Sequence, residues 1–172
     1  MHSTPAAFRT EGRERVLAAL MGALAIALPQ AFHLVGLGAV FLPMHLPVAL
    51  AGMMVRPGLA AAIGVLAPVL SFFIAGMPPA PLVPLMAVEL AVLGSVGALL
   101  RRRLGLPVWA AVPGAVVARV AVTFLVITLL GGYLRLPRVE SAAAWVAAGL
   151  PGIVLQLIAV PAAVQLLRQR GA

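Results

Sequence analysis

Arg119 and Glu89 are ionisable residues that stand deep inside apolar stretches of this sequence. Arg119 lies near the middle of the run 108–131, and Glu89 lies within the run 82–100. A guanidinium does not shed its charge by losing a proton, and a charge at membrane depth costs roughly 2.5–3.5 kcal/mol on insertion scales. Each charge therefore needs an opposite charge, a wet cavity or a bound solute. A long arginine side chain can span much of the difference in depth between the two positions.

Two interpretations of this pair stay open. In the first, Glu89 and Arg119 form a buried ion pair that fixes helix packing. In the second, which we favour because intramembrane charges are usually functional, they line a solute pocket and touch the substrate. The two are compatible, since a ligand carboxylate can share Arg119 with Glu89. A guanidinium suits a planar carboxylate because its fork makes two hydrogen bonds.

Other polar residues within apolar runs are further candidates for the pocket. Thr123 follows Arg119 by four residues, so both lie on one helix face. Gln156 is expected near the depth of Arg119, and Ser71 and His45 nearer the outer side. Each has a structural alternative, because an amide often bonds a neighbouring helix and a hydroxyl can bond its own backbone. His45 stands between two prolines, in an irregular stretch that either lines the pocket or only connects.

The composition indicates a membrane protein. Of 172 residues, 63% are hydrophobic and 9% are charged, whereas soluble domains have about 45–50% and about 25%. All the positive charge behind the net +8 comes from arginine, and apart from Arg119 the arginines lie at the ends of apolar runs or between them. Membrane orientation explains these arginines better than a nucleic-acid partner does. There is no cysteine, so no disulfide and no thiolate metal site is expected.

The apolar runs predict an all-α membrane protein with six transmembrane helices. A bilayer core about 30 Å thick needs about 20 apolar residues per helix. Residues 1–15 are expected to be a cytoplasmic segment, and 16–168 one membrane domain in the bacterial plasma membrane. The second run is the least regular, and its outer part can be a loop. The six runs are 16–35, 38–55, 58–76, 82–100, 108–131 and 142–167.

The arginines predict that both termini are cytoplasmic. With six helices and the N-terminus inside, nine arginines fall on the inner side and two, Arg135 and Arg138, on the outer side. This is a strong positive-inside bias to which every inner segment contributes. The inner arginines are Arg9, Arg13, Arg15, Arg56, Arg101, Arg102, Arg103, Arg168 and Arg170.

The segments expected on the outer side are apolar and rich in proline, glycine and methionine. Met77 belongs to one of them, and Tyr133 to another. We expect these segments to fold over an outward-facing pocket, with Met77 and Tyr133 near the substrate. The alternative is that they rest in the headgroup zone, where Tyr133 would be an interfacial anchor.

A stripe of small residues marks the first helix. Ala19, Ala23 and Ala27 are four residues apart, so they share one face and allow another helix to approach closely. In a chain so rich in alanine the pattern has little weight alone. Gly94 and Ala98 form a similar pair in the run 82–100.

Catalytic motifs are not found. No Walker motif, no H-E-x-x-H sequence and no nucleophile elbow occurs in the sequence. We therefore expect neither an enzyme nor a cofactor, and any ATP hydrolysis that drives transport would take place in partner subunits.

The chain resembles the substrate-binding subunit, or S component, of energy-coupling factor (ECF) vitamin transporters. The similarity lies in the stretches 42–48 and 76–79, in Glu89 with the two residues that follow it, and in Arg119. The resemblance implies a six-helix membrane fold that captures a vitamin from outside beneath closing loops. It also implies association with a transmembrane coupling subunit and two cytoplasmic ATPases. In that family an Ala-x-x-x-Ala motif on the first helix forms the docking surface, which Ala19 and Ala23 match and Ala27 extends.

The leading hypothesis is therefore a high-affinity micronutrient-binding subunit of an ABC-type importer. A carboxylate on the substrate would be held by Arg119, with Glu89 orienting Arg119 or accepting a substrate donor. The alternative is a proton-coupled secondary transporter or channel in which Glu89 is the proton site. A lipid-modifying membrane enzyme and an assembly subunit without a ligand are weaker alternatives. No residue pattern identifies which vitamin is bound.

Overall fold

The computed structural model describes residues 6–34, 42–132, 143 and 146–169, and all regular structure in these ranges is helical. The prediction of an all-α fold is therefore confirmed. The elements are α1 (Ala6–Leu34), α3 (His45–Met54), α4 (Pro57–Ala75), the short 3-10 helix η1 (Ala80–Leu82), α5 (Val83–Arg102), α6 (Val108–Leu130) and α8 (Leu150–Gln169).

Proline and glycine set several of the helix boundaries. Helix α4 begins at Pro57, since proline is tolerated where the first turn needs no backbone donor. It ends before Gly76, whose φ of 67° is left-handed and whose N–H donates to Phe72 O at 2.8 Å. Helix α6 starts directly after the extended residue Pro107. The predicted runs 58–76, 82–100 and 108–131 match α4, α5 and α6 closely.

The second apolar run differs from its prediction. Residues 38–41 of the run lie outside the described residues. In the described part of this run, from residue 42 on, the helix is the ten-residue α3, about 15 Å long, which is too short to cross a bilayer core of about 30 Å. The cause is local. Pro43 disfavours a helical conformation at the residue before it, Leu42, whose φ is 48°. Pro47 lies in the first turn of α3, where a proline is tolerated. Five helices of the described residues, not six, are long and apolar enough to span a membrane.

Two other boundaries also differ. Helix α1 begins at Ala6, so much of the segment 1–15, predicted to precede the first helix, continues it. The candidate span within α1 is Glu11–Phe32. Helix α8 begins at Leu150, later than residue 142, and residues 133–142, 144 and 145 lie outside the described residues.

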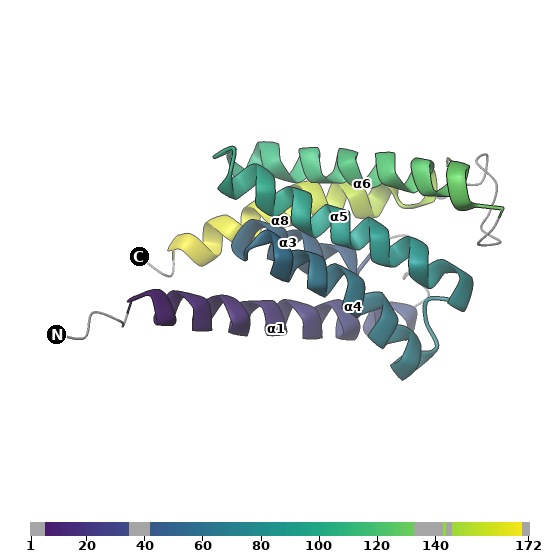
Figure 1. The fold of residues 1–172 in the computed structure, drawn as a ribbon, viewed down its shortest axis with the longest axis horizontal. Helices are drawn as coiled ribbons and strands as arrows, with labels where there is room; N and C mark the ends of the chain where they lie inside the picture. Colours follow the sequence, from purple (N-terminus) through teal and green to yellow (C-terminus); the bar gives the residue numbers. More distant parts are fainter. Residues whose placement is uncertain (1–5, 35–41, 133–142, 144–145, 170–172) are drawn as a thin grey trace.

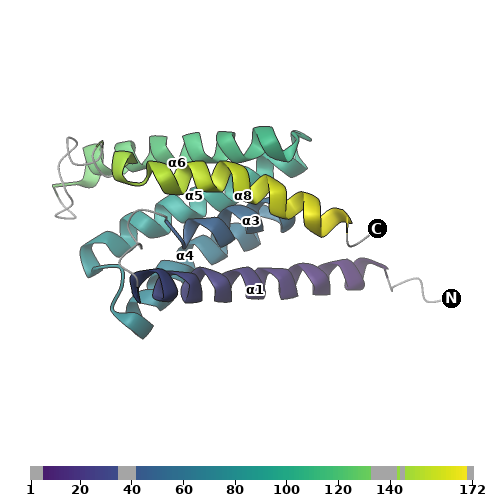
Figure 2. The ribbon, with the colours of Figure 1, turned by 180° about the vertical axis from the view of Figure 1, so that it is seen from behind.

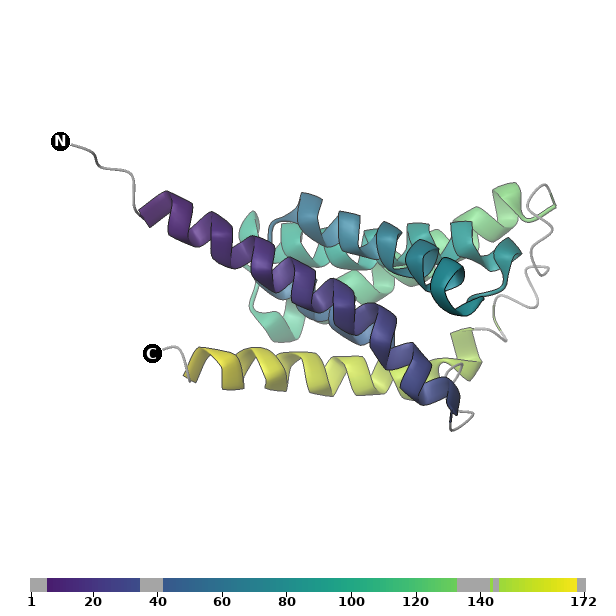
Figure 3. The same ribbon diagram turned by 90° about the horizontal axis from the view of Figure 1, so that it is seen from below.

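Helix α5 lies in the middle of the bundle, against α3, α4 and α6. Helix α1 packs on α3 and α4, and α8 packs on α3 and α6 (Figures 1 and 2). The view from below in Figure 3 shows α1 running obliquely to the other helices. The short helix α3 contacts α1, α4, α5, α6 and α8, so it is enclosed by long helices.

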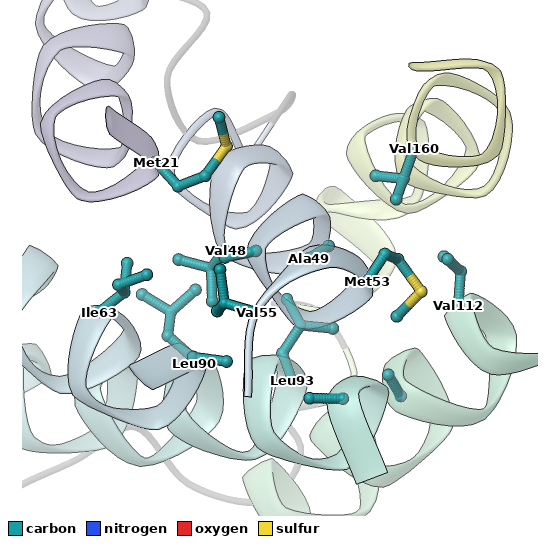
Figure 4. Packing of buried hydrophobic residues seen from close by; sticks show 14 of the residues in the cluster. Met21, Val48, Ala49, Met53, Val55, Ile63, Leu90, Leu93, Val112 and Val160 are labelled. Carbon is teal, nitrogen blue, oxygen red and sulfur yellow. The ribbon is translucent and has the colours of Figure 1, made fainter. Parts of the chain in front are cut away.

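The main hydrophobic core surrounds α3. Its Val48 is fully buried, as are Leu90 and Leu93 of α5. Figure 4 shows these side chains together, with Met21 of α1 and Val160 of α8 approaching α3 from either side. The core is therefore built around a helix that most of the long helices share.

The outward faces of the long helices are also apolar. Phe73 of α4 is 78% exposed, and Val117 of α6 and Ile158 of α8 are exposed as well. Large apolar side chains over so much of the surface are the usual condition in lipid and an unusual one in water. Together with the five long apolar helices, they are compatible with a multi-pass membrane protein.

Ion pairs gather the arginine-rich segments at one end of the bundle. Glu14 of α1 pairs with Arg102 at the end of α5 and, at 3.2 Å, with Arg56 between α3 and α4. Glu11 Oε1 lies 3.9 Å from Nη2 of the same Arg56. The start of α1 and the end of α8 lie at this end too (Figures 1 and 2). That both chain ends face the cytoplasm stays a prediction.

Helices α4 and α5 approach so closely that their backbones touch at glycine. A Cβ added to Gly64 would overlap the backbone of Leu90 and Ala91, and one added to Gly94 would lie 2.8 Å from Ala60 O. Gly94, expected to mark a face for another helix, thus serves the packing of α5 on α4. This contact holds α5, and with it Glu89, in place.

We expect Gly64→Ala to destabilise the protein by roughly 1–3 kcal/mol, because the methyl group must force two packed backbones apart. The measurement is the free energy of unfolding by denaturing detergent, in the same mild micelle for each variant. Gly22→Ala is the matched control, since a Cβ there meets nothing within 4 Å. Equal effects of the two substitutions would contradict the close contact between α4 and α5.

Candidate functional site

The carboxylate of Glu89 is the meeting point of a buried polar cluster. The Thr123 hydroxyl donates a hydrogen bond to Glu89 Oε1 at 2.6 Å. Arg119 Nη1 lies 3.7 Å and His45 Nε2 3.8 Å from Glu89 Oε2. All four side chains are buried, and together they are called the Glu89 cluster below. The expectation that Arg119 reaches Glu89 is met by this geometry.

The helix register brings the cluster together. Helices α5 and α6 are antiparallel, and a Cβ on Gly97 would lie 3.5 Å from Ala115. Glu89 precedes Gly97 on α5 by as many residues as Thr123 follows Ala115 on α6. Because the helices are antiparallel and Gly97 faces Ala115, Glu89 therefore faces Thr123. Arg119 lies one turn before Thr123 on the same face, and its long side chain extends to Glu89.

Helix α3 supplies the remaining member of the cluster. His45 is its first residue, so α3 begins beside Glu89, in the interior of the bundle. The first turn of a helix carries a partial positive charge from its unpaired N–H groups. The carboxylate thus meets a guanidinium, a hydroxyl and an imidazole near the start of α3.

Several buried nitrogen atoms of the cluster have no hydrogen-bond partner among the described residues. The Arg119 and His45 contacts to Glu89 are longer than direct hydrogen bonds. Among the described residues, Arg119 Nε and both ring nitrogens of His45 have no hydrogen-bond partner. A buried polar group without a partner costs about 1–3 kcal/mol, so these atoms are the ones in the cluster with unused hydrogen-bonding capacity.

Gln156 and Ser71 are buried but are not joined to the cluster by a polar contact among the described residues. Both amide atoms of Gln156 and the Ser71 hydroxyl lack hydrogen-bond partners there. Gln156 belongs to α8, which packs against the helices that carry His45 and Arg119. Because Gly64 faces Leu90, the register places Ser71 about 10 Å along the bundle from Glu89, away from the basic end.

The predicted loop residues have different outcomes. Met77 is half-buried in the link between α4 and η1, at the end of the bundle opposite the ion-paired arginines. Tyr133 lies outside the described residues, as do residues 35–41. Closure of these segments over a pocket stays a prediction.

The small residues of α1 point away from the bundle. Ala19, Ala23 and Ala27 are exposed, whereas Ala18 and Ala25 lie on the face that packs inward. The stripe therefore contributes no packing to the described part of the chain and is accessible to another helix or to lipid.

Comparison of the chain with protein-family models, with curated proteins and with solved structures found no match in any of the three. The class of protein is therefore described by the structure itself: a helical bundle with a buried charged cluster, in which the described residues form five apolar helices of membrane-spanning length.

Two features were missed from the sequence. His45 and Glu89 were each predicted as site residues, but a contact between them was not predicted. The pairing of Glu11 and Glu14 with arginines of other segments was not anticipated either. The signal for the latter was available, since two acidic residues three apart stand in a segment otherwise rich in arginine.

We expect Glu89→Gln to destabilise the protein by about 3–5 kcal/mol, because it leaves the Arg119 guanidinium buried without an opposite charge. In the double variant Glu89→Gln/Arg119→Met, much of this loss should be recovered, since no unpaired charge remains. The measurement is a double-mutant cycle on the free energy of unfolding in micelles. Arg103→Gln, at an exposed position after α5, is the control. Simple additivity of the two substitutions would argue against an energetic pairing of Glu89 with Arg119.

Proposed function

We propose that the protein is a membrane-embedded subunit that captures a small carboxylate-bearing micronutrient from outside the cell. The observation that carries the proposal is the Glu89 cluster, in which a buried Arg119 lies at ion-pair distance from Glu89 while its Nε has no partner among the described residues. A solute carboxylate could take the donors of Arg119 that Glu89 leaves free. Glu89 and Thr123 would orient the guanidinium.

The surroundings support recognition of a small amphipathic solute. The cluster is enclosed by apolar side chains, and a low-dielectric setting strengthens its electrostatic contacts. The buried amide of Gln156 and hydroxyl of Ser71 offer further hydrogen bonds to a solute that extends beyond the carboxylate. Met77 and the neighbouring link lie at the end of the bundle from which such a solute would enter.

We infer that uptake requires partner subunits, as in the energy-coupling factor transporters that the chain resembles. The sequence has no ATPase motif, and the exposed stripe of Ala19, Ala23 and Ala27 offers α1 as a contact for a transmembrane coupling subunit. Two cytoplasmic ATPases would complete the importer. The function is that of a binding subunit without catalysis of its own.

A second candidate is a proton-coupled transporter or channel. It is favoured by the 3.8 Å approach of His45 to Glu89, which places two titratable groups side by side inside the bundle. The energy source separates the two functions. Uptake that survives ATP depletion but collapses with the proton gradient would establish the second.

Native mass spectrometry of gently purified protein tests the proposed function. We expect a small molecule to remain bound to the natural protein and to be absent from Arg119→Ala. Ser95→Ala is a suitable control, because Ser95 bonds its own helix at Ala91 O and should retain the adduct. If the bound molecule had the same occupancy in Arg119→Ala, Arg119 would not be part of the binding site.

Docking through α1 is tested by Ala23→Trp. The bulky side chain should abolish cellular uptake and leave the bound molecule in place, because it blocks close approach of a partner helix without touching the Glu89 cluster. Val117→Trp, on an exposed position of α6, should keep uptake. Normal uptake by Ala23→Trp would exclude the α1 stripe as the docking surface.

A further inference from the structure

His45 sets the net charge of the Glu89 cluster, since the charges of Glu89 and Arg119 cancel. Neither ring nitrogen of His45 has a hydrogen-bond partner among the described residues, and its Nε2 lies 3.8 Å from Glu89 Oε2. An imidazolium donates from both ring nitrogens, and no described residue accepts a hydrogen bond from His45 Nδ1. With His45 neutral, the cluster has no net charge.

Other charges lie far from His45 in the part of the chain that the structure describes. Helix α4 has no ionisable residue, and α8 has none before Arg168 in its last turns. The acidic residues of α1, Glu11 and Glu14, pair with arginines at the basic end of the bundle. Among the described side chains of the helices packed around α3, the charges that His45 meets are Glu89 of α5 and Arg119 of α6.

A carboxylate added to this cluster would leave one uncompensated negative charge in an apolar interior. Such a charge is strongly disfavoured, because the low dielectric provides little solvation. In addition, turning Arg119 toward the new carboxylate would deprive Glu89 Oε2 of its cation. A proton on His45 removes both problems, since it restores neutrality and gives Oε2 a new cationic neighbour that already lies 3.8 Å away.

We propose that the site binds a carboxylate solute together with one proton, which His45 takes up on the nitrogen that faces Glu89. The solute brings one negative charge and the solvent supplies the proton, so the cluster stays neutral. Arg119 leaves Glu89 and pairs with the solute carboxylate. Glu89 then accepts a hydrogen bond from the protonated His45 Nε2 in place of its contact with Arg119. This inference rests on the proposed function and narrows the substrate class to acids that bind with a proton.

The test uses acetate as the probe, on the natural protein in lipid nanodiscs, with thermal unfolding as the readout. Acetate is ionised throughout the range from about pH 6 to about pH 8, in which histidine titrates. We expect acetate to stabilise the protein more at the lower pH, with an apparent Kd that rises about tenfold per pH unit. Acetamide, a neutral molecule of similar shape, and chloride at equal ionic strength should give no such dependence.

Variants separate the roles within the cluster. His45→Gln, which cannot gain the charge, should bind acetate weakly at both pH values, and Arg119→Ala should not bind it. Ser95→Ala should behave like the natural protein. Should His45→Gln fail to fold, calorimetry of the natural protein in two buffers of different ionisation enthalpy gives the proton number directly, with one proton expected per acetate.

The outcomes distinguish this inference from the proposed function. Equal stabilisation by acetate at both pH values would overturn the proton uptake and leave the carboxylate site standing. No stabilisation at either pH, with an Arg119-dependent adduct still present in native mass spectrometry, would mean that the solute is not an acid, which overturns the inference and keeps a binding function. Loss of both signals would overturn the two together.

Discussion

A carboxylate buried in an apolar bundle must have its charge balanced by protein groups, and this constraint organises the centre of the molecule. Glu89 meets it with three side chains from two other helices: Thr123 by a hydrogen bond, and Arg119 and His45 at ion-pair distance. The groups depend on one another, because removing any one changes the charge or the bonding of the rest. The glycine contacts between α4 and α5 then matter for the site, since they hold the helix that carries Glu89.

The shortness of α3 is part of the same arrangement. A full-length helix in its place would continue past Glu89, whereas α3 begins there and presents its first turn and His45 to the carboxylate. Because α3 is enclosed by the longer helices, its apolar residues form the core while its first residue belongs to the polar cluster. The structural and the functional interpretation of the Glu89–Arg119 pair are compatible, because the same two side chains can balance each other's charge and, as we propose, offer groups to a solute.

The sequence was sufficient for the helical class and for most of the long helices, because apolar length, proline and glycine are local signals. Glu89 and Arg119 could be singled out in advance because so few charges occur in apolar runs, although the sequence left open whether they pair or contact a ligand. The prolines around His45 indicated that the outer part of the second run could be a loop, but an apolar count alone did not give the start or the length of α3. The contact of His45 with Glu89 and the pairing of Glu14 with Arg102 depend on tertiary register, which periodicity alone does not supply. That the segment containing Tyr133 closes over a pocket remains a prediction from the sequence.

The central claim is that Arg119 exchanges its partner Glu89 for a carboxylate solute. A structure of the protein in nanodiscs with its co-purified molecule retained tests it most directly. We expect an anionic group of that molecule at about 3 Å from the Arg119 guanidinium, with His45 moved to hydrogen-bonding distance of Glu89. A bound molecule elsewhere in the bundle, with Arg119 still facing Glu89 alone, would contradict it.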